Sequence, residues 1–339
     1  MKSKYQNAFF IFGIVVLAVM LSQLDYVKVW EGLKHAGYWF LAVVLLWLFL
    51  YLFNTTSWYI IIRSGLKNTP DHTENTPAKR PFSYAWLYKI TVSGFALNYA
   101  TPGGLMGGEP YRIMALTPYV GVERATSSVV LYAMTHIFSH FWFWLLSVAL
   151  YLLTQTLTPM MSVMLTVVGA FCVLAIWFFL SGYKKGLAVR CLSLLQHVPG
   201  VKKWAVRFVH SHQEQLSDID KQIAALHNQN PRTFVTVVLL ELACRVCSAL
   251  EVMFILLVLF PSVQFVDCIL VIAFTTLFAN MLFFMPLQLG GREGGFMMSV
   301  SALGLTTNAG IFVALLVRLR ELIWTAIGLL LIKMERKKK

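Results

Sequence analysis

Two short stretches of the sequence nearly repeat each other: Thr101-Pro102-Gly103-Gly104-Leu105-Met106-Gly107-Gly108-Glu109 and Met285-Pro286-Leu287-Gln288-Leu289-Gly290-Gly291-Arg292-Glu293. Each follows an apolar run, places a proline and a glycine pair ahead of a glutamate, and is followed by a second apolar pattern. Apolar segments interrupted by Pro and Gly in corresponding positions of two halves are typical of membrane transporters. The two motifs therefore predict two broken membrane helices, one in each half of the chain.

The composition is that of a membrane protein. Hydrophobic residues make up 58% of the chain, charged residues make up 13%, and the mean hydropathy is +0.69. A soluble domain of this length rarely carries so few charges. The net charge of +13 comes mainly from Lys and Arg in the tail and in the loops. This distribution predicts contacts with anionic membrane lipids and excludes nucleic acid as a partner.

Six uninterrupted apolar runs have lengths near the ~20 residues that span hydrocarbon. They lie at about 8–24, 39–62, 125–153, 160–181, 233–260 and 308–332. The first run follows Lys2 and Lys4, but residues 21–25 offer no small-residue cleavage site, which favours an uncleaved helix over a signal peptide. We therefore predict six full transmembrane helices.

Lysine and arginine predict the orientation of these helices, because cytoplasmic loops carry an excess of both. We expect three groups of them on the cytoplasmic side: Arg63, Lys67, Lys79 and Arg80; the basic residues from Lys184 to Arg207; and Lys333 to Lys339. The links 154–159 and 261–265 carry no charge and are expected outside. Both termini are then cytoplasmic.

This orientation leaves two segments that must return to the side from which they enter. The apolar pieces 84–100 and 110–120 enter from the cytoplasm, and 266–304 enters from outside. The sequence therefore predicts an all-α polytopic protein in a single transmembrane domain, 1–339, with six full helices and two re-entrant broken-helix hairpins. Its first repeat, about 39–153, and its second, about 233–332, have inverted topology. An amphipathic cytoplasmic segment, about 183–232, separates them.

The hairpin tips are candidate anion sites. Proline ends a helix, glycine permits close backbone approach, and the N–H groups at the start of the next helix favour a phosphate. The backbone residues that we assign to this role are Pro102, Gly103, Gly104, Gly107, Gly108, Pro286, Gly290 and Gly291. A pair of ordinary loops is the alternative.

Charged side chains within membrane segments are functional candidates, because each costs a few kcal/mol unless it is paired or solvated. Arg112 and Arg292 could bind a lipid phosphate, while Glu109 and Glu293 could hold those arginines, accept a head-group ammonium or carry a proton. The alternative is mutual ion pairing that locks the two hairpins together. Glu241 and Arg245, spaced i, i+4, are further candidates, and their simplest role is to neutralise one another.

Two histidines, His136 and His140, have the i, i+4 spacing of two metal ligands. No carboxylate or cysteine accompanies them at a convincing position, and their neighbours are aromatic, so we interpret them as packed or hydrogen-bonded side chains. A proton relay is the alternative. We assign no metal and no cofactor, since the cysteines are scattered and neither a Gly-x-Ser-x-Gly nor a Walker motif is present.

The chain resembles the transmembrane family of lysylphosphatidylglycerol synthases and flippases over about residues 5–335. The resemblance rests on Pro102-Gly103-Gly104, Gly107-Gly108-Glu109, Arg112, Pro286, Gly290-Gly291-Arg292-Glu293, Gly304 and Arg318. It implies a bacterial inner-membrane protein. It also favours Arg318 as a site residue over Arg320 and Glu321, its charged neighbours on the last helix.

The best understood members of that family join this membrane module to a cytoplasmic domain that transfers lysine to phosphatidylglycerol, and the module moves the product between leaflets. Here Lys337-Lys338-Lys339 directly follows the last helix, so we expect no lysyl transfer. The resemblance then implies translocation of an anionic or zwitterionic lipid or lipid-linked intermediate. The alternatives are an intramembrane head-group transferase with Glu109 or His136 as general base, and a non-catalytic partner in a cell-envelope synthesis complex.

Overall fold

The structure is a computed structural model that describes residues 15, 26–67, 81–100, 107–185, 231–281 and 291–335. Every regular element in these ranges is a helix. The helices are α2 (Tyr26–Ala36), α3 (Tyr38–Lys67), α4 (Tyr84–Ala100), α5 (Gly108–Val120), α6 (Val122–Thr154), α7 (Pro159–Lys185), α11 (Pro231–Leu256), α12 (Phe265–Met281), α13 (Gly291–Ala302) and α14 (Thr307–Glu335). The expected all-α class is confirmed for this part of the chain.

Five of the six predicted long runs are confirmed as helices, namely α3, α6, α7, α11 and α14. The first run, 8–24, lies outside the described residues except for the helical Val15. The predicted segment 183–232 lies almost wholly outside them as well. Helix α2 was not expected from the sequence, and Gly37, with a φ of 51°, separates it from α3. Positive φ values favour glycine, which explains why the chain turns there.

Three helices within the described ranges are long and apolar enough to cross a membrane by length and composition alone. They contain Tyr38–Ser64, Val122–Thr154 and Pro159–Ser181. Helices α11 and α14 have comparable lengths of 26 and 29 residues, but charged side chains interrupt their apolar sequence. Their charged residues form part of the candidate site described below.

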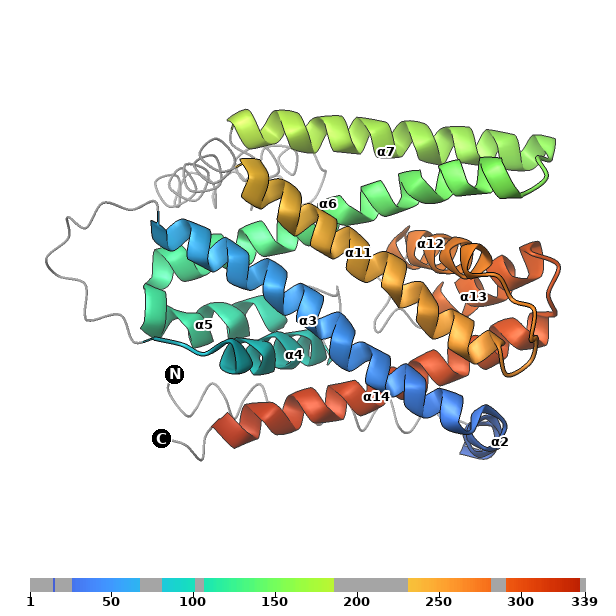
Figure 1. Cartoon of the computed structure of the whole chain (residues 1–339), viewed down its shortest axis with the longest axis horizontal. Helices are drawn as coiled ribbons and strands as arrows, with labels where there is room; N and C mark the ends of the chain where they lie inside the picture. The colour runs from blue at the N-terminus through green and yellow to red at the C-terminus, as the bar shows by residue number, and fades with distance from the viewer. Residues whose placement is uncertain are drawn as a thin grey trace, which may run out of the picture.

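The hairpin helices are shorter than the long helices. Helices α4 and α12 have 17 residues each, α5 has 13 and α13 has 12. The sequence predicted both helices of the first hairpin within a few residues of their bounds. It predicted the second hairpin only as the segment 266–304, which corresponds to α12 and α13. Figure 1 shows α4 and α5 toward one end of the molecule and α12 and α13 toward the other, while the long helices run along its length.

The same packing pattern occurs in the set α3–α6 and in the set α11–α14. Helix α3 contacts α4 and α6, α4 contacts α5, and α5 contacts α6; α11 likewise contacts α12 and α14, α12 contacts α13, and α13 contacts α14. Between the sets, α3 packs on α11, α4 on α14 and α12 on α6. The two sets run in opposite directions along the long axis (Figure 1). Each hairpin therefore packs against the last helix of the other set.

Small residues bring α4 and α14 close together. A Cβ atom on Gly328 would lie 2.5 Å from the Cβ atom of Ala96 and 3.0 Å from the carbonyl oxygen of Val92. The Ser93 hydroxyl donates to the Gly328 carbonyl oxygen at 3.1 Å. Helices pack in membranes through such small residues, because lipid provides little hydrophobic driving force. The contact fixes the first hairpin against the second set.

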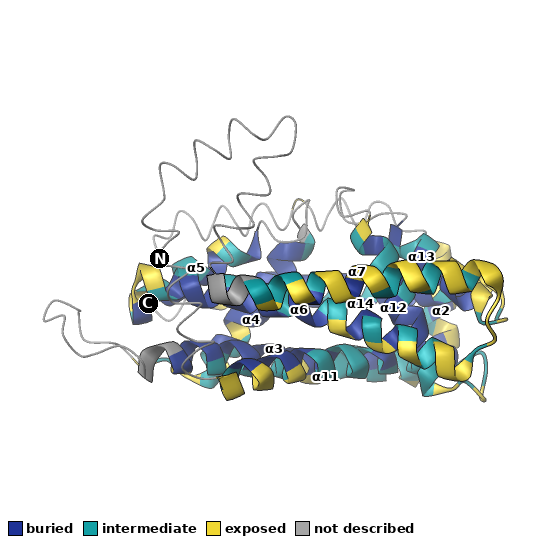
Figure 2. Ribbon diagram, turned by 90° about the horizontal axis from the view of Figure 1, so that it is seen from above, coloured by how far each residue is buried: buried dark blue, intermediate teal, exposed yellow. Residues whose placement is uncertain are grey.

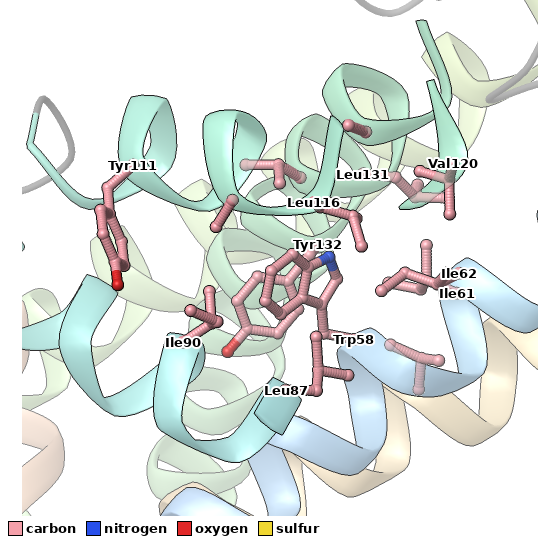
Figure 3. Packing of buried hydrophobic residues seen from close by; sticks show 14 of the residues in the cluster. Trp58, Ile61, Ile62, Leu87, Ile90, Tyr111, Leu116, Val120, Leu131 and Tyr132 are labelled. Atoms are coloured by element: carbon pink, nitrogen blue, oxygen red, sulfur yellow. The ribbon is translucent and has the colours of Figure 1, made fainter. Parts of the chain in front are cut away.

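The core of the first set is built around two large aromatic side chains. Trp58 of α3 and Tyr132 of α6 are buried with ring centroids 6.2 Å apart, and Figure 3 shows Leu87 and Leu116 close to them. By contrast, α7 exposes apolar side chains along its length (Figure 2), among them Met160, Val163 and Trp177. An exposed apolar helix face of this kind is typical of contact with lipid.

Candidate functional site

In the first hairpin, the start of α5 lies very close to α4. The Gly108 N–H donates to Asn98 Oδ1 at 2.7 Å, and a Cβ atom on Gly108 would lie 2.2 Å from the carbonyl oxygen of Gly94. Only glycine fits at that distance. Gly107 and Gly291 also lie at the starts of α5 and α13. The remaining predicted tip residues lie outside the described residues: Pro102, Gly103, Gly104, Pro286 and Gly290.

Arg112 of α5 lies in the interior, only 1% exposed. Its Nη2 donates to the Thr91 carbonyl oxygen at 3.3 Å, and its Nη1 lies 3.4 Å from Glu109 Oε1. The guanidinium carbon lies 4.6 Å from the ring centroid of Phe95 and 5.3 Å from that of Tyr132. We call Arg112, Glu109 and their contacts the hairpin cluster. Cation–π contacts supply part of the stabilisation that water would otherwise give.

The hairpin cluster keeps unused hydrogen-bonding capacity. Among the described residues, Arg112 Nε and Glu109 Oε2 are buried and have no hydrogen-bond partner. The Nε side of Arg112 faces Gly94, since a Cβ atom on Gly94 would lie 2.4 Å from that nitrogen. An unsatisfied buried donor or acceptor costs about 1–3 kcal/mol. One guanidinium N–H and one carboxylate oxygen of the hairpin cluster therefore lack a hydrogen-bond partner among the described residues.

A second polar cluster joins α3, α6 and α11, and we call it the histidine cluster. Asn54 Nδ2 of α3 donates to both carboxylate oxygens of the buried Glu241 at 3.2 Å, and His136 Nδ1 of α6 lies 2.7 Å from Glu241 Oε2. Arg245 of α11 donates instead to α6: its Nη2 to the His136 carbonyl oxygen and its Nη1 to His140 Nε2, both at 2.7 Å. Its Nε donates to the Ser139 hydroxyl, also at 2.7 Å.

A third group, the α14 cluster, connects the last helix with four others. Arg320 donates from Nε to Glu251 Oε1 at 2.7 Å and from Nη2 to Glu251 Oε2 at 2.9 Å. Its guanidinium carbon lies 3.9 Å from the ring centroid of Trp47, whose Nε1 also donates to Glu251. The neighbouring Glu321 accepts from Tyr99 of α4 at 3.2 Å and pairs with Arg292 of α13. Glu321 thus contacts both hairpins.

Arg318 pairs with Glu293 at the start of α13 and is more exposed than Arg320. The side chain of Arg318 is 12% exposed and that of Arg320 is 1% exposed. The residue with the weaker sequence signal, Arg320, is therefore the more deeply buried of the two. Both lie close to the second hairpin.

The ion pairs differ from two sequence interpretations. Glu109 and Arg112 pair within the first hairpin, while Arg292 and Glu293 pair with α14, so the described contacts include no direct ion pair between the hairpins. The hydrogen bonds of Glu241 and Arg245 in the described structure go to α3 and α6. Their i, i+4 spacing places both on one face of α11. Their hydrogen bonds there go to the neighbouring helices and not to each other.

The histidines are hydrogen-bonded, as interpreted, but the statement that no carboxylate accompanies them was wrong. Glu241 is 105 residues from His136 in the sequence and contacts it directly. Within the described ranges, no group of three or more His, Cys, Asp or Glu side chains is placed to hold a metal ion.

Sequence reasoning did not assign site roles to Asn54, Trp47, Tyr99, Glu251 and Arg320. A usable signal existed for Asn54, because it is an amide within an otherwise apolar helix. Glu251 and Arg320 carried the same signal. The contacts of each residue depend on how the helices are rotated against one another. Packing between distant segments of the chain determines this rotation.

Comparison with known proteins gives one match. The family model described as "Lysylphosphatidylglycerol synthase TM region" matches residues 8–328, nearly the whole chain. A search of curated proteins and a search of solved structures return no match. The apolar helices and the family match together identify a multi-pass membrane protein related to lipid handling. The chain belongs to the family of lysylphosphatidylglycerol synthase transmembrane regions.

Proposed function

We propose that this protein translocates an anionic or zwitterionic phospholipid, or a lipid-linked intermediate, between the two leaflets of a bacterial inner membrane. The observation that carries the proposal is the hairpin cluster, where Arg112 offers a buried N–H and Glu109 offers a buried carboxylate oxygen. A phosphate oxygen accepts from a guanidinium, and a head-group ammonium donates to a carboxylate. The two open groups together therefore suit a lipid head group that contains a phosphate, with or without an amine.

The membrane arrangement that we propose has six full spans and two re-entrant hairpins. At 1.5 Å per residue, helices of 12–17 residues measure about 18–26 Å, which is less than the ~30 Å of hydrocarbon. A pair of such helices suits a hairpin that enters and leaves on one side. The opposite directions of the two sets support an inverted repeat (Figure 1). Charged side chains on α11 and α14 are tolerated because they face other helices.

Alternating access is the mechanism that we propose for this arrangement. Each hairpin packs on the last helix of the opposite set, and Glu321 of α14 links Tyr99 of the first hairpin to Arg292 of the second. If one hairpin moves, the partners of Glu321 must change. We propose that a head group bound at Arg112 is exposed to each leaflet in turn by such exchanges, with Arg292 as the corresponding arginine of the second hairpin.

The test is leaflet exchange of fluorescent phospholipids in proteoliposomes. The variants are Arg112→Ala and Arg292→Ala, and the matched control is Arg232→Ala, an exposed arginine at the start of α11. Loss of a charge-assisted hydrogen bond costs about 1.5–3 kcal/mol, so each hairpin variant should slow protein-dependent exchange by about tenfold or more. Equal exchange in all four proteins would contradict the assignment of the hairpin arginines.

A head-group transferase is the second candidate, and the contact of His136 Nδ1 with Glu241 favours it, because a histidine oriented by a carboxylate can act as a general base. A transferase would consume a donor and change the mass of the lipid, whereas a translocating protein changes only its sidedness. Mass spectrometry of lipids recovered from the same proteoliposomes separates the two. A role as a partner in a cell-envelope synthesis complex predicts neither change.

A further inference from the structure

We propose that His136, held by Glu241, is a proton-binding site, and that proton binding there is coupled to an anionic head group at Arg112. The inference deepens the proposed function and rests on it. It predicts that the protein moves one proton with each monoanionic lipid, in the same direction.

The contacts of Glu241 define which atom of His136 takes the proton. An ionised carboxylate only accepts hydrogen bonds, so the 2.7 Å contact places a proton on His136 Nδ1. The Nε2 atom is then the atom that titrates, and no described residue donates to it or accepts from it. The His136 side chain is 25% exposed. A proton from water adds to the Nε2 lone pair and gives an imidazolium beside an ionised Glu241; release reverses the step, and no other bond changes.

His140 is excluded from this role by its own contacts. Its Nε2 accepts from Arg245 at 2.7 Å, and its Nδ1 lies 3.2 Å from the His136 carbonyl oxygen. An arginine has no lone pair to offer, so Nε2 must carry the lone pair and Nδ1 the proton. A second proton on His140 would break the contact with Arg245. The two neighbouring histidines therefore have different tasks.

The charged and titratable groups that face His136 come from three helices. They are Glu241 and Arg245 of α11, Arg112 of α5, and Tyr132 and His140 of α6. Cys244 of α11 and Glu109 of α5 lie around Tyr132, which contacts the His136 ring. The neighbours from α3 and α4 are Asn54, which reaches Glu241, and Phe95, and neither of them titrates. Burial, Arg245 and Arg112 oppose the imidazolium, while the carboxylate of Glu241 favours it.

Two aromatic side chains lie between the His136 ring and the Arg112 guanidinium, where we propose that the head group binds. Phe95 and Tyr132 each lie 6.1 Å from the His136 ring, centroid to centroid, and each also contacts the Arg112 guanidinium. A head-group phosphate bound at Arg112 offsets the positive charge that opposes protonation of His136. Because binding couplings are reciprocal, a proton on His136 strengthens binding of an anion at Arg112 by the same factor. A loaded site with a proton and a monoanionic lipid adds no net charge.

The experiment applies a pH difference across proteoliposomes that contain a fluorescent phosphatidylglycerol. The lipid should accumulate in the leaflet that faces the alkaline compartment, with a leaflet ratio that approaches about tenfold per pH unit for one proton per lipid. Added membrane potential should leave that ratio unchanged. Exchange that ignores the pH difference, or accumulation on the acidic side, overturns the inference while the proposed function stands.

The variants are His136→Gln and Glu241→Gln, with His35→Gln on α2 as the matched control because His35 is exposed and far from the cluster in sequence. Exchange in both cluster variants should no longer follow the pH difference, and the control should follow it as the wild type does. Cluster variants that still follow it overturn the inference. Two variants at separate positions keep the test valid if one of them fails to fold.

A second measurement does not depend on transport. Nitrogen NMR of labelled histidine in lipid nanodiscs, with the His136 signal assigned from the His136→Gln spectrum, should show that Nε2 gains and loses a proton as the pH is varied. Phosphatidylglycerol should shift the titration to higher pH relative to neutral lipid, and Arg112→Ala should remove that shift. If wild type moves no lipid at all, the proposed function fails, and this spectrum alone decides the proton site. A His136 signal without titration overturns it.

Discussion

Arg320 on α14 and Glu251 on α11 form a doubly hydrogen-bonded ion pair, with Nε–Oε1 and Nη2–Oε2 distances of 2.7 and 2.9 Å. The two residues are 69 positions apart in the sequence, and both are almost fully buried. Trp47 of α3 stacks on the guanidinium and donates to the carboxylate. Three helices from both sets therefore meet at one neutralised charge pair.

Glu251→Gln and Arg320→Met should each destabilise the protein strongly, because each leaves one buried charge without its partner. Such losses amount to about 3–5 kcal/mol in buried pairs. The double variant should be more stable than Arg320→Met or Glu251→Gln alone, since it buries neither charge. Thermal unfolding in detergent, followed with a thiol-reactive dye on the buried cysteines, measures the effect. A double variant as unstable as the sum of the singles would contradict the pairing.

Gly328→Ala should separate α4 from α14 and slow lipid exchange. The added methyl group would lie 2.5 Å from Ala96 Cβ, a distance that real Cβ contacts do not adopt. Gly169→Ala on α7 is the control, because its methyl group would lie 3.9 Å from Val148 and Ala favours a helix. Exchange rates and thermal stability of both variants should be compared, and a Gly328→Ala protein that behaves like Gly169→Ala contradicts the close packing.

Gly94→Ala should impair the hairpin cluster without removing a charge. Its methyl group would lie 2.4 Å from Arg112 Nε, so the guanidinium must move away from its present position. Exchange of anionic lipid should fall toward that of Arg112→Ala. The control is Gly294→Ala on α13, where the methyl group would lie at an ordinary 3.6 Å from Phe278. Unchanged exchange in Gly94→Ala would mean that the position of Arg112 does not matter.

Single cysteines introduced in a cysteine-free background should report the two sides of the membrane. The exposed positions Thr158 and Ser262 lie in links that we expect outside, whereas the exposed Ser83 and Arg232 should be cytoplasmic. Gln155 Nε2 donates to Asp267 Oδ1 at 3.1 Å, which places the two outer links at the same end of the molecule. A membrane-impermeant maleimide applied to intact cells should label only the first two positions, and the reverse pattern would invert the topology.

The sequence was sufficient to predict the long described helices and both helices of the first hairpin, but not α2. The hairpin helices 84–100 and 110–120 correspond to α4 and α5, because proline and glycine mark their ends by local chemistry. Helix α2 could not be found in the same way, since its apolar residues are too few to span a membrane and its packing depends on α14. Gly32 of α2, for example, lies against Leu315.

The partners of the charged residues could not be predicted. Spacing places Glu241 and Arg245 on one face of α11, but their actual contacts depend on α3 and α6, which are more than 100 positions away. For the same reason the preference for Arg318 missed the deeper position of Arg320. The sequence identifies which charged side chains are unfavourable in a membrane. Only the packing of distant helices shows which contacts stabilise them.

The exchange rate of fluorescent phosphatidylglycerol across a series of proteoliposomes with increasing protein content tests lipid translocation most directly. With wild type, the fraction of lipid reached by a membrane-impermeant quencher should rise from the outer-leaflet fraction toward completion as more vesicles contain a protein molecule. With Arg112→Ala it should stay near the protein-free value. A wild-type series that remains at the protein-free value at every protein content, with folded protein in the vesicles, would contradict translocation by this protein.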